Sequence, residues 1–399
     1  MVRVIGPGNY GLVNFASAFV AYFTLIVNYG FNLSATREIA QSRNSAGKVN
    51  EIFNSVVFAK VILFLVSTAA FLVCLLTVQK FRQEPVLFAY AYIGLLGTTF
   101  FPTWLFQGLE QLSLIAVFNF VTRLLFTVSI FIFVTARGDY LVYALISSLG
   151  GMVGGLGAFI YAVRKFNLGL RFPSIVALKN AYKGGWVLFS STVVISIYTT
   201  SNIVILGFFA NSTDVGFYSG AMKFVAVAQG LVAMPLNQSL YPHIATSFKQ
   251  SYGAGVNKLK KATVVVGGLT FAASVGLLVV SDLAVRLVLG PEFLPAITTL
   301  RLLAFVPFML GLSNVFGIQG LLNLHKDRIF FLITSAGALL SLALNFMLTP
   351  VLVQNGTAVS WLASEVFITA AMYVALRKED INVFDLRFIR NYLLERASV

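Results

Sequence analysis

Residues 53–78 read FNSVVFAKVILFLVSTAAFLVCLLTV, a run of 26 residues in which Lys60 is the one charged side chain. A helix rises about 1.5 Å per residue, so an apolar helix of about 20 residues crosses the hydrocarbon core of a bilayer. The run also lacks the glycine and proline residues that end helices. It therefore predicts a transmembrane helix.

Similar runs recur along the whole chain, bounded by charged clusters or by Gly, Pro and Asn. Of the 399 residues, 58% are hydrophobic and 11% are charged, and the mean hydropathy is +0.87. This composition, with Cys74 as the one cysteine, excludes a soluble enzyme, a disordered chain and a disulfide-rich secreted domain. The sequence predicts an all-α polytopic membrane protein with about eleven transmembrane helices. Besides 53–78, the predicted spans are Tyr10–Leu33, Val86–Leu109, Leu114–Ala136, Tyr140–Val163, Trp186–Phe209, Gly216–Leu240, Ala262–Val280, Ala296–Leu322, Ile329–Val353 and Thr357–Leu376.

The net charge of +14 arises from Lys and Arg residues that lie mostly between the apolar runs. A nucleic-acid-binding protein gathers such residues on one soluble face, so the expected partner is the lipid bilayer and not nucleic acid. One set of alternate connections, together with the C-terminal tail, carries most of these basic residues. The positive-inside rule assigns that side to the cytoplasm, so we expect a cytoplasmic C-terminus.

Two segments, one in each half of the chain, resemble each other: YGLVNFASAF at 10–19 and VGFYSGAMKF at 215–224. In the second half a whole predicted span, beginning at Trp186, precedes this segment, and the first half has no counterpart. We therefore expect two parallel six-helix lobes around a cavity, with one helix missing from the first lobe. This architecture is typical of a transporter. The predicted domains are an N-terminal lobe of five helices at 1–180, a C-terminal lobe of six helices at 181–376 and a cytoplasmic basic tail at 377–399.

Four short segments, in this order, carry a resemblance to a known family: IGPGNYG at 5–11, ATREIA at 35–40, PTWLFQGLE at 102–110 and LGPEF at 289–293. The chain resembles the polysaccharide-unit flippases (Wzx type) of the multidrug/oligosaccharidyl-lipid/polysaccharide exporter superfamily, and among them the O-antigen unit translocases. That family begins with one more helix, which contributes cavity-lining residues. The resemblance thus also implies that a first helix is missing.

The resemblance implies a transporter and not an enzyme. Its cargo would be an undecaprenyl-pyrophosphate-linked oligosaccharide, moved by alternating access from the cytoplasmic to the periplasmic leaflet of the bacterial inner membrane. Polysaccharide polymerase and chain-length machinery would then use the translocated unit. Two alternatives share the fold, namely a multidrug or metabolite exporter and an exporter of another lipid-linked polysaccharide unit. A glycosyltransferase or polymerase would carry a large external loop or an acidic catalytic cluster, and the predicted outer connections are short.

Charged side chains inside a membrane span are costly unless they face a wet cavity or a partner, so each is a candidate site residue. Arg123 lies about nine residues into its span, about 14 Å along the axis and too deep to reach the membrane surface easily. It is the strongest candidate. Lys60, Lys223 and Arg301 lie about 8–10 Å from a span boundary, so they either line the cavity or extend to the headgroups.

These cations outnumber the acids Glu110 and Glu365 within the spans, which predicts an anionic cargo. A pyrophosphate needs fixed cations to replace its hydration, and the forked donors of Arg match phosphate oxygens. Arg37, at a helix end, is a further candidate contact for the lipid pyrophosphate, with membrane anchoring as the alternative. Glu365 is the candidate site for a coupling proton or sodium ion, with a structural ion pair as the alternative.

Several sequence patterns bear on cofactors and on helix geometry. No phosphate-binding loop or cluster of metal-ligating residues occurs, so no cofactor and no metal are expected and the mechanism would be secondary transport. Prolines within spans predict kinks, at Pro102, Pro235, Pro307 and Pro350. The glycines at 150, 151, 154, 155 and 157 predict close helix packing.

Overall fold

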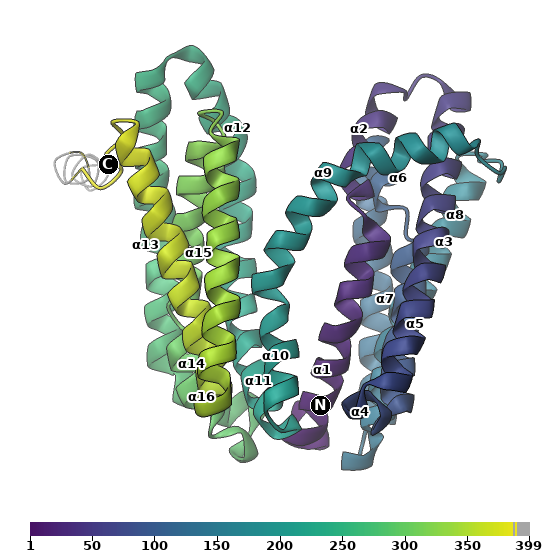
Figure 1. Ribbon diagram of the computed structural model, residues 1–399, viewed down its shortest axis with the longest axis horizontal. Coiled ribbons are helices and arrows are strands. Elements are labelled where there is room, and N and C mark those ends of the chain that lie inside the picture. The colour runs from purple at the N-terminus through teal and green to yellow at the C-terminus, as the bar shows by residue number, and fades with distance from the viewer. Residues whose placement is uncertain (386–387, 389–399) are drawn as a thin grey trace. The chain divides into compact units, whose positions relative to one another are not determined.

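The computed structural model describes residues 1–385 and residue 388, which form helices and connecting turns with no strand among them (Figure 1). Eight of the described helical segments are long and apolar enough to cross a membrane. The prediction of an all-α multi-pass membrane protein is confirmed, while the count of eleven spans stays a prediction. The structure does not describe the side chains at 187, 188, 191, 195, 197, 198, 232–239, 241 and 242.

The chain divides into two compact units, Met1–Ser196 and Ile197–Val399. The division falls inside helix α9 (Ile175–Thr199), whereas the sequence predicts a lobe boundary between residues 180 and 181. Most of the predicted basic tail at 377–399 lies outside the described residues.

The N-terminal unit is a bundle of long helices with short helical turns at its ends. Besides most of α9, its elements are α1 (Val2–Asn28), α2 (Phe31–Gln41), α3 (Ala46–Thr77), α4 (Gln79–Arg82), α5 (Pro85–Phe100), α6 (Thr103–Gly108), α7 (Leu112–Phe133), a 3₁₀ turn (Arg137–Asp139) and α8 (Tyr140–Lys165). In Figure 1, α2 and α6 lie at the end of this unit opposite the N-terminus of the chain.

The predicted span Tyr10–Leu33 contains the end of one helix and the beginning of the next. Helix α1 ends at Asn28, because Tyr29 and Gly30 adopt left-handed conformations with φ of 41° and 76°. Such a conformation cannot continue a right-handed helix. The chain therefore turns at this point and begins α2.

Helices α5 and α8 approach each other at glycine residues. A Cβ atom added at Gly97 or Gly155 would collide with the backbone of the facing helix. This contact confirms the close helix packing that the glycine cluster predicts. Helix α5 ends at Phe100 and α6 begins at Thr103. The predicted kink at Pro102 is therefore a complete break between two helices.

The C-terminal unit contains longer helices interrupted by π-helical turns. Its elements are α10 (Ser201–Phe209), α11 (Ser212–Ala228), a π turn (Gln229–Ala233), α12 (Met234–Gln250), α13 (Tyr252–Ala284), a π turn (Val285–Leu289), a 3₁₀ turn (Pro291–Phe293), α14 (Ala296–Leu303), α15 (Val306–Asn314), a π turn (Val315–Leu321) and α16 (Asp327–Lys378). Helix α16 is interrupted at Val353, whose φ is 53°, so it consists of two helices that correspond to the last two predicted spans.

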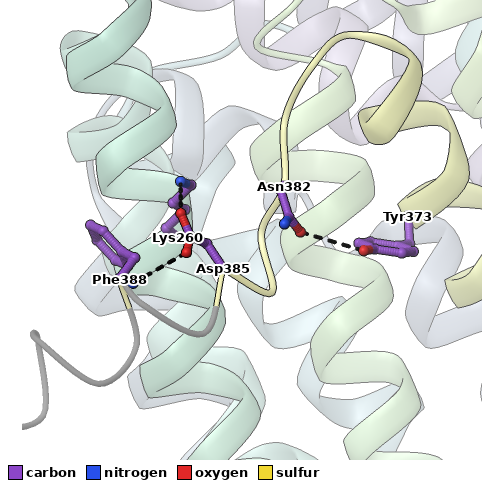
Figure 2. A network of polar contacts seen from close by, with 5 residues as sticks. All are labelled: Lys260, Tyr373, Asn382, Asp385 and Phe388. Atoms are coloured by element: carbon purple, nitrogen blue, oxygen red, sulfur yellow. Dashed lines mark hydrogen bonds and ion pairs between the residues drawn. The ribbon is translucent and has the colours of Figure 1, made fainter.

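The residues after α16 fold back onto the C-terminal unit. The Tyr252 hydroxyl on α13 donates to the Glu379 carbonyl at 2.6 Å, and Ile381 and Val383 are fully buried. Lys260 Nζ lies 3.0 Å from Asp385 Oδ2, and the Phe388 backbone N–H donates to the same carboxylate (Figure 2). This segment therefore packs against the end of α13.

Candidate functional site: a polar groove on the N-terminal unit

Arg123 lies on α7, a 22-residue helix with no buried residue among those described. Much of the exposed surface of α7 is apolar, as at Phe131, which is 69% exposed. Asn119 and Thr127 lie four residues before and after Arg123, so the three side chains share one face of the helix. A polar stripe on an apolar helix needs water or a polar ligand opposite it.

The stripe borders a hollow between α7 and α8. This hollow has a volume of about 370 Å³, and its lining includes Asn119, Arg123 and Thr127 from α7 and Ser147 and Gly151 from α8. A charged group that enters this hollow would meet Arg123.

A second hollow, of about 240 Å³, adjoins the first. Asn119 and Gly151 line both hollows, so the two are adjacent. We call the combined feature the polar groove, and it lies entirely within the N-terminal unit. The second hollow is lined by Asn28, Asn32, Gly97, Thr98, Phe101, Thr103, Asn119 and Gly151.

The polar groove contains a positive charge without a matching acid. No Asp or Glu occurs among the residues that line its two hollows. Within the described part of the chain, the side chains of Arg123, Asn119 and Asn28 make no hydrogen bond or ion pair with another residue.

Lys60 lies on α3 behind the wall of the groove and is 2% exposed. Its Nζ donates a hydrogen bond of 2.6 Å to the backbone carbonyl of Thr98. In an unbroken helix this carbonyl would accept from the N–H of residue 102, but Pro102 has none. Lys60 therefore satisfies the carbonyl that the proline leaves free. The role of Lys60 in cargo binding stays a prediction.

The remaining predicted cations lie elsewhere. Arg37 is exposed on α2, next to Glu38. Lys223 is exposed on α11 of the C-terminal unit. Arg301, on α14, donates from Nε to the Ser281 hydroxyl at 3.1 Å. A role in cargo binding stays a prediction for all three.

A model of the family described as "Polysaccharide biosynthesis protein" matches residues 1–248. The chain belongs to this family. A protein from Escherichia coli (strain K12) is 32% identical over 383 residues, which cover 96% of this chain and 92% of the relative. A protein from Shigella dysenteriae is 28% identical over 381 residues, covering 94% and 93%. Both bear the name "Putative O-antigen transporter". The family resemblance carried by the four short segments is thereby confirmed.

Two solved structures share the fold of this chain. "Lipid II flippase MurJ, inward closed conformation" has a TM-score of 0.76 at 13% identity, covering 98% of this chain and 86% of the other. An inward-facing multidrug resistance MATE family transporter of the MOP superfamily has a TM-score of 0.72 at 14% identity, covering 97% and 93%. The chain thus has the membrane-transporter fold that the resemblance implies.

Glu365 is 1% exposed within the second part of α16. Its Oε1 accepts a hydrogen bond of 3.3 Å from the indole Nε1 of Trp361, one turn earlier. In the described part of the chain no basic side chain forms a salt bridge with it, so the structural ion pair considered from the sequence is not seen. Its role in ion coupling stays a prediction.

Sequence reasoning singled out Arg123 but missed the uncharged members of the groove. Asn28, Asn32 and Asn119 lie on three different helices and carry no charge. A criterion based on charged residues within spans does not identify them. One signal was available, because Asn119, Arg123 and Thr127 are spaced by four in an apolar span. Nothing in the sequence connects that stripe with Asn28 and Asn32.

Proposed function

We propose that this protein moves undecaprenyl-pyrophosphate-linked O-antigen repeat units from the cytoplasmic to the periplasmic leaflet of the bacterial inner membrane. The observation that carries the proposal is Arg123, an exposed cation near the middle of an apolar helix, which forms no ion pair with a described residue and borders a groove whose lining contains no acid. Membership of the family and the names of its relatives agree with such a cargo.

Arg123 gives the anionic cargo an alternative to water. A pyrophosphate that leaves the membrane surface loses hydration, and a guanidinium replaces part of it with forked, charge-assisted hydrogen bonds. Opposite unit charges 4 Å apart attract by about 4 kcal/mol at an effective dielectric constant of about 20. Arg123 therefore lowers the barrier for the charged part of the lipid, and alternating access of the two lobes would expose it to each side in turn.

The charge of the groove argues against the alternative of a multidrug exporter. Cationic drugs need acidic residues to balance their charge, whereas the one charged residue in the lining of the groove is Arg123. The lining does not distinguish an O-antigen unit from another lipid-linked polysaccharide unit, since both carry a phosphate-linked sugar. The names of the relatives favour the former.

The energy for net transport would come from an ion gradient. Glu365 is a carboxylate fully buried in the C-terminal unit and is the group we assign to a coupling proton or sodium ion. The translocated unit would then pass to the polysaccharide polymerase and chain-length machinery in the periplasm. No cofactor is part of this mechanism.

The test is to delete the gene in its host and to measure both surface polysaccharide and undecaprenyl-linked oligosaccharide in extracted lipids. The lipid intermediate should accumulate while surface polysaccharide falls, and the wild-type chain should reverse both. Arg123→Ala should restore less than about one tenth of the polysaccharide at equal abundance in the membrane. Asn44→Ala, an exposed substitution in the turn before α3, is the matched control. Full rescue by Arg123→Ala would contradict the assignment.

A further inference from the structure

The connection from α8 to α9 and the first half of α9 form a positively charged segment of the N-terminal unit. Helix α8 is long and apolar enough to cross a membrane and ends at Lys165, and the next predicted span begins at Trp186. The segment thus joins two spans, and we expect it at a membrane boundary. The nearest acids along the chain are Asp139 and Asp214. Between them the basic residues are Arg164, Lys165, Arg171, Lys179 and Lys183.

One face of the first half of α9 packs against the N-terminal unit. The Tyr182 hydroxyl donates to the Ala59 carbonyl at 3.0 Å, and the Tyr182 ring meets the Tyr29 ring edge-on, with 5.3 Å between the centroids. Leu178 and Ala181 pack against an apolar cluster of the same unit. Figure 1 shows this part of α9 crossing the unit near α2 and α6. These contacts fix the opposite face of the helix away from the unit.

The opposite face carries apolar and basic side chains together. Ile175 is 71% exposed, and Lys179 and Lys183 follow it at spacings of four, so the three share one side of the helix. Just before the helix, Phe172 is 89% exposed. Water suits the lysines but not the apolar side chains, and hydrocarbon suits the apolar side chains but not the lysines. The headgroup region of a bilayer accommodates both, because the stem of a lysine lies along apolar chains while its ammonium group reaches the phosphates.

Two acids lie near α9 and could in principle neutralise its lysines. Glu38 and Glu51 line a hollow of about 200 Å³ together with residues of α2, α3 and α9. In the described part of the chain, neither acid forms an ion pair with Lys179 or Lys183. The positive charge of this face is therefore not balanced by an ion pair to a described acid.

We infer that residues 170–183 form a binding surface for anionic phospholipids of the leaflet on the cytoplasmic side. Arg171, Lys179 and Lys183 contact the headgroup phosphates, and Phe172 and Val176 insert among the upper parts of the acyl chains. Each basic residue close to an anionic membrane surface strengthens binding by about fivefold. The inference concerns a surface outside the polar groove and does not depend on the proposed cargo.

The test measures contact between this surface and defined lipids in the full-length protein. Cys74→Ser removes the one cysteine, and Val176→Cys then carries a fluorophore. The protein is placed in nanodiscs that contain both phosphatidylglycerol and phosphatidylcholine, and one of the two lipids bears a nitroxide quencher at the same mole fraction. Quenching by labelled phosphatidylglycerol should exceed quenching by labelled phosphatidylcholine by at least about 3-fold at low salt. The difference should vanish at about 1 M salt, which screens charges beyond about 3 Å.

Substitutions connect the preference to the basic residues. In the triple variant defined below, the preference should fall below about 1.5-fold while quenching by phosphatidylcholine stays unchanged, which also shows that the segment keeps its place. Lys249→Gln, an exposed substitution on the C-terminal unit, should keep the full preference. The triple variant replaces three basic residues by glutamine: Arg171→Gln, Lys179→Gln and Lys183→Gln.

A second labelling position calibrates contact with lipid. A fluorophore at Asn44→Cys, in the exposed turn before α3, should be quenched weakly by both lipids. Quenching at Val176→Cys that is no stronger than at Asn44→Cys would place the segment in water and overturn the inference. Equal quenching by the two lipids at low salt, or an undiminished preference in the triple variant, would overturn it as well.

Discussion

Lys60 is buried within the N-terminal unit and has no acidic partner among the described residues. Burying an amino group is costly unless it makes hydrogen bonds, and here the bond is to the Thr98 carbonyl. Pro102 creates the need for that bond, because it cannot donate to Thr98. Two residues that are each unfavourable in an apolar helix therefore compensate each other.

Lys60→Met should lower the stability of the protein by about 1–3 kcal/mol, because it leaves the partly buried Thr98 carbonyl without a donor. The measurement is the Tm of the purified protein in detergent, which should fall by several degrees. Lys48→Met is the matched control, since Lys48 lies on the same helix and is exposed. An equal Tm for the two variants would show that the contact between Lys60 and Thr98 has little energetic weight.

The pair of helices α5 and α8 forms one wall of the groove by packing glycine against backbone. The wall holds Thr98 of α5 and Gly151 of α8 at the groove surface. Close backbone approach of this kind is a common basis of helix association in membranes, where lipid offers no hydrophobic driving force between helices. The position of this wall therefore depends on glycine residues, whose lack of a side chain lets the two backbones approach closely.

Substitutions at two glycines of α8 distinguish the effect of helix packing on stability from the effect of helix propensity. A Cβ at Gly155 would collide with the backbone of Gly97, whereas a Cβ at Gly157 would be 3.8 Å from Phe118, an ordinary contact. Gly155→Ala should therefore reduce the yield and the Tm of the folded protein, and Gly157→Ala should leave both unchanged or slightly raised. Size-exclusion chromatography and thermal unfolding in detergent give both values. Equal behaviour of the two variants would contradict this account of the packing.

Span locations could be predicted from sequence because about 20 apolar residues are needed whatever the helix contacts. The ends could not, since α1 stops at Asn28 through the backbone conformation of Tyr29 and Gly30, which hydropathy does not encode. Arg123 was identifiable as a charge deep in a span. Asn28 was not identifiable, because only the packing of separate helices brings it to the hollow next to the one lined by Arg123.

At the scale of the whole molecule, the orientation in the membrane follows from charge. The connections on the proposed cytoplasmic side and the C-terminal tail carry most of the Lys and Arg residues. Green fluorescent protein fused to the C-terminus should therefore fluoresce, and alkaline phosphatase at the same place should be inactive. Active alkaline phosphatase with a dark fluorescent fusion would reverse the orientation and the proposed direction of transport.

We propose that the protein translocates a lipid-linked sugar and that Arg123 is essential for this translocation. The most direct test uses proteoliposomes. The purified protein is reconstituted with undecaprenyl pyrophosphate carrying one fluorescent N-acetylhexosamine, and the fraction that reaches the opposite leaflet is measured with a membrane-impermeant quencher. We expect translocation with the wild-type protein and with Asn44→Ala, and a rate at least about 10-fold lower with Arg123→Ala. Equal rates for Arg123→Ala and the wild-type protein, or no translocation above protein-free liposomes, would contradict the claim.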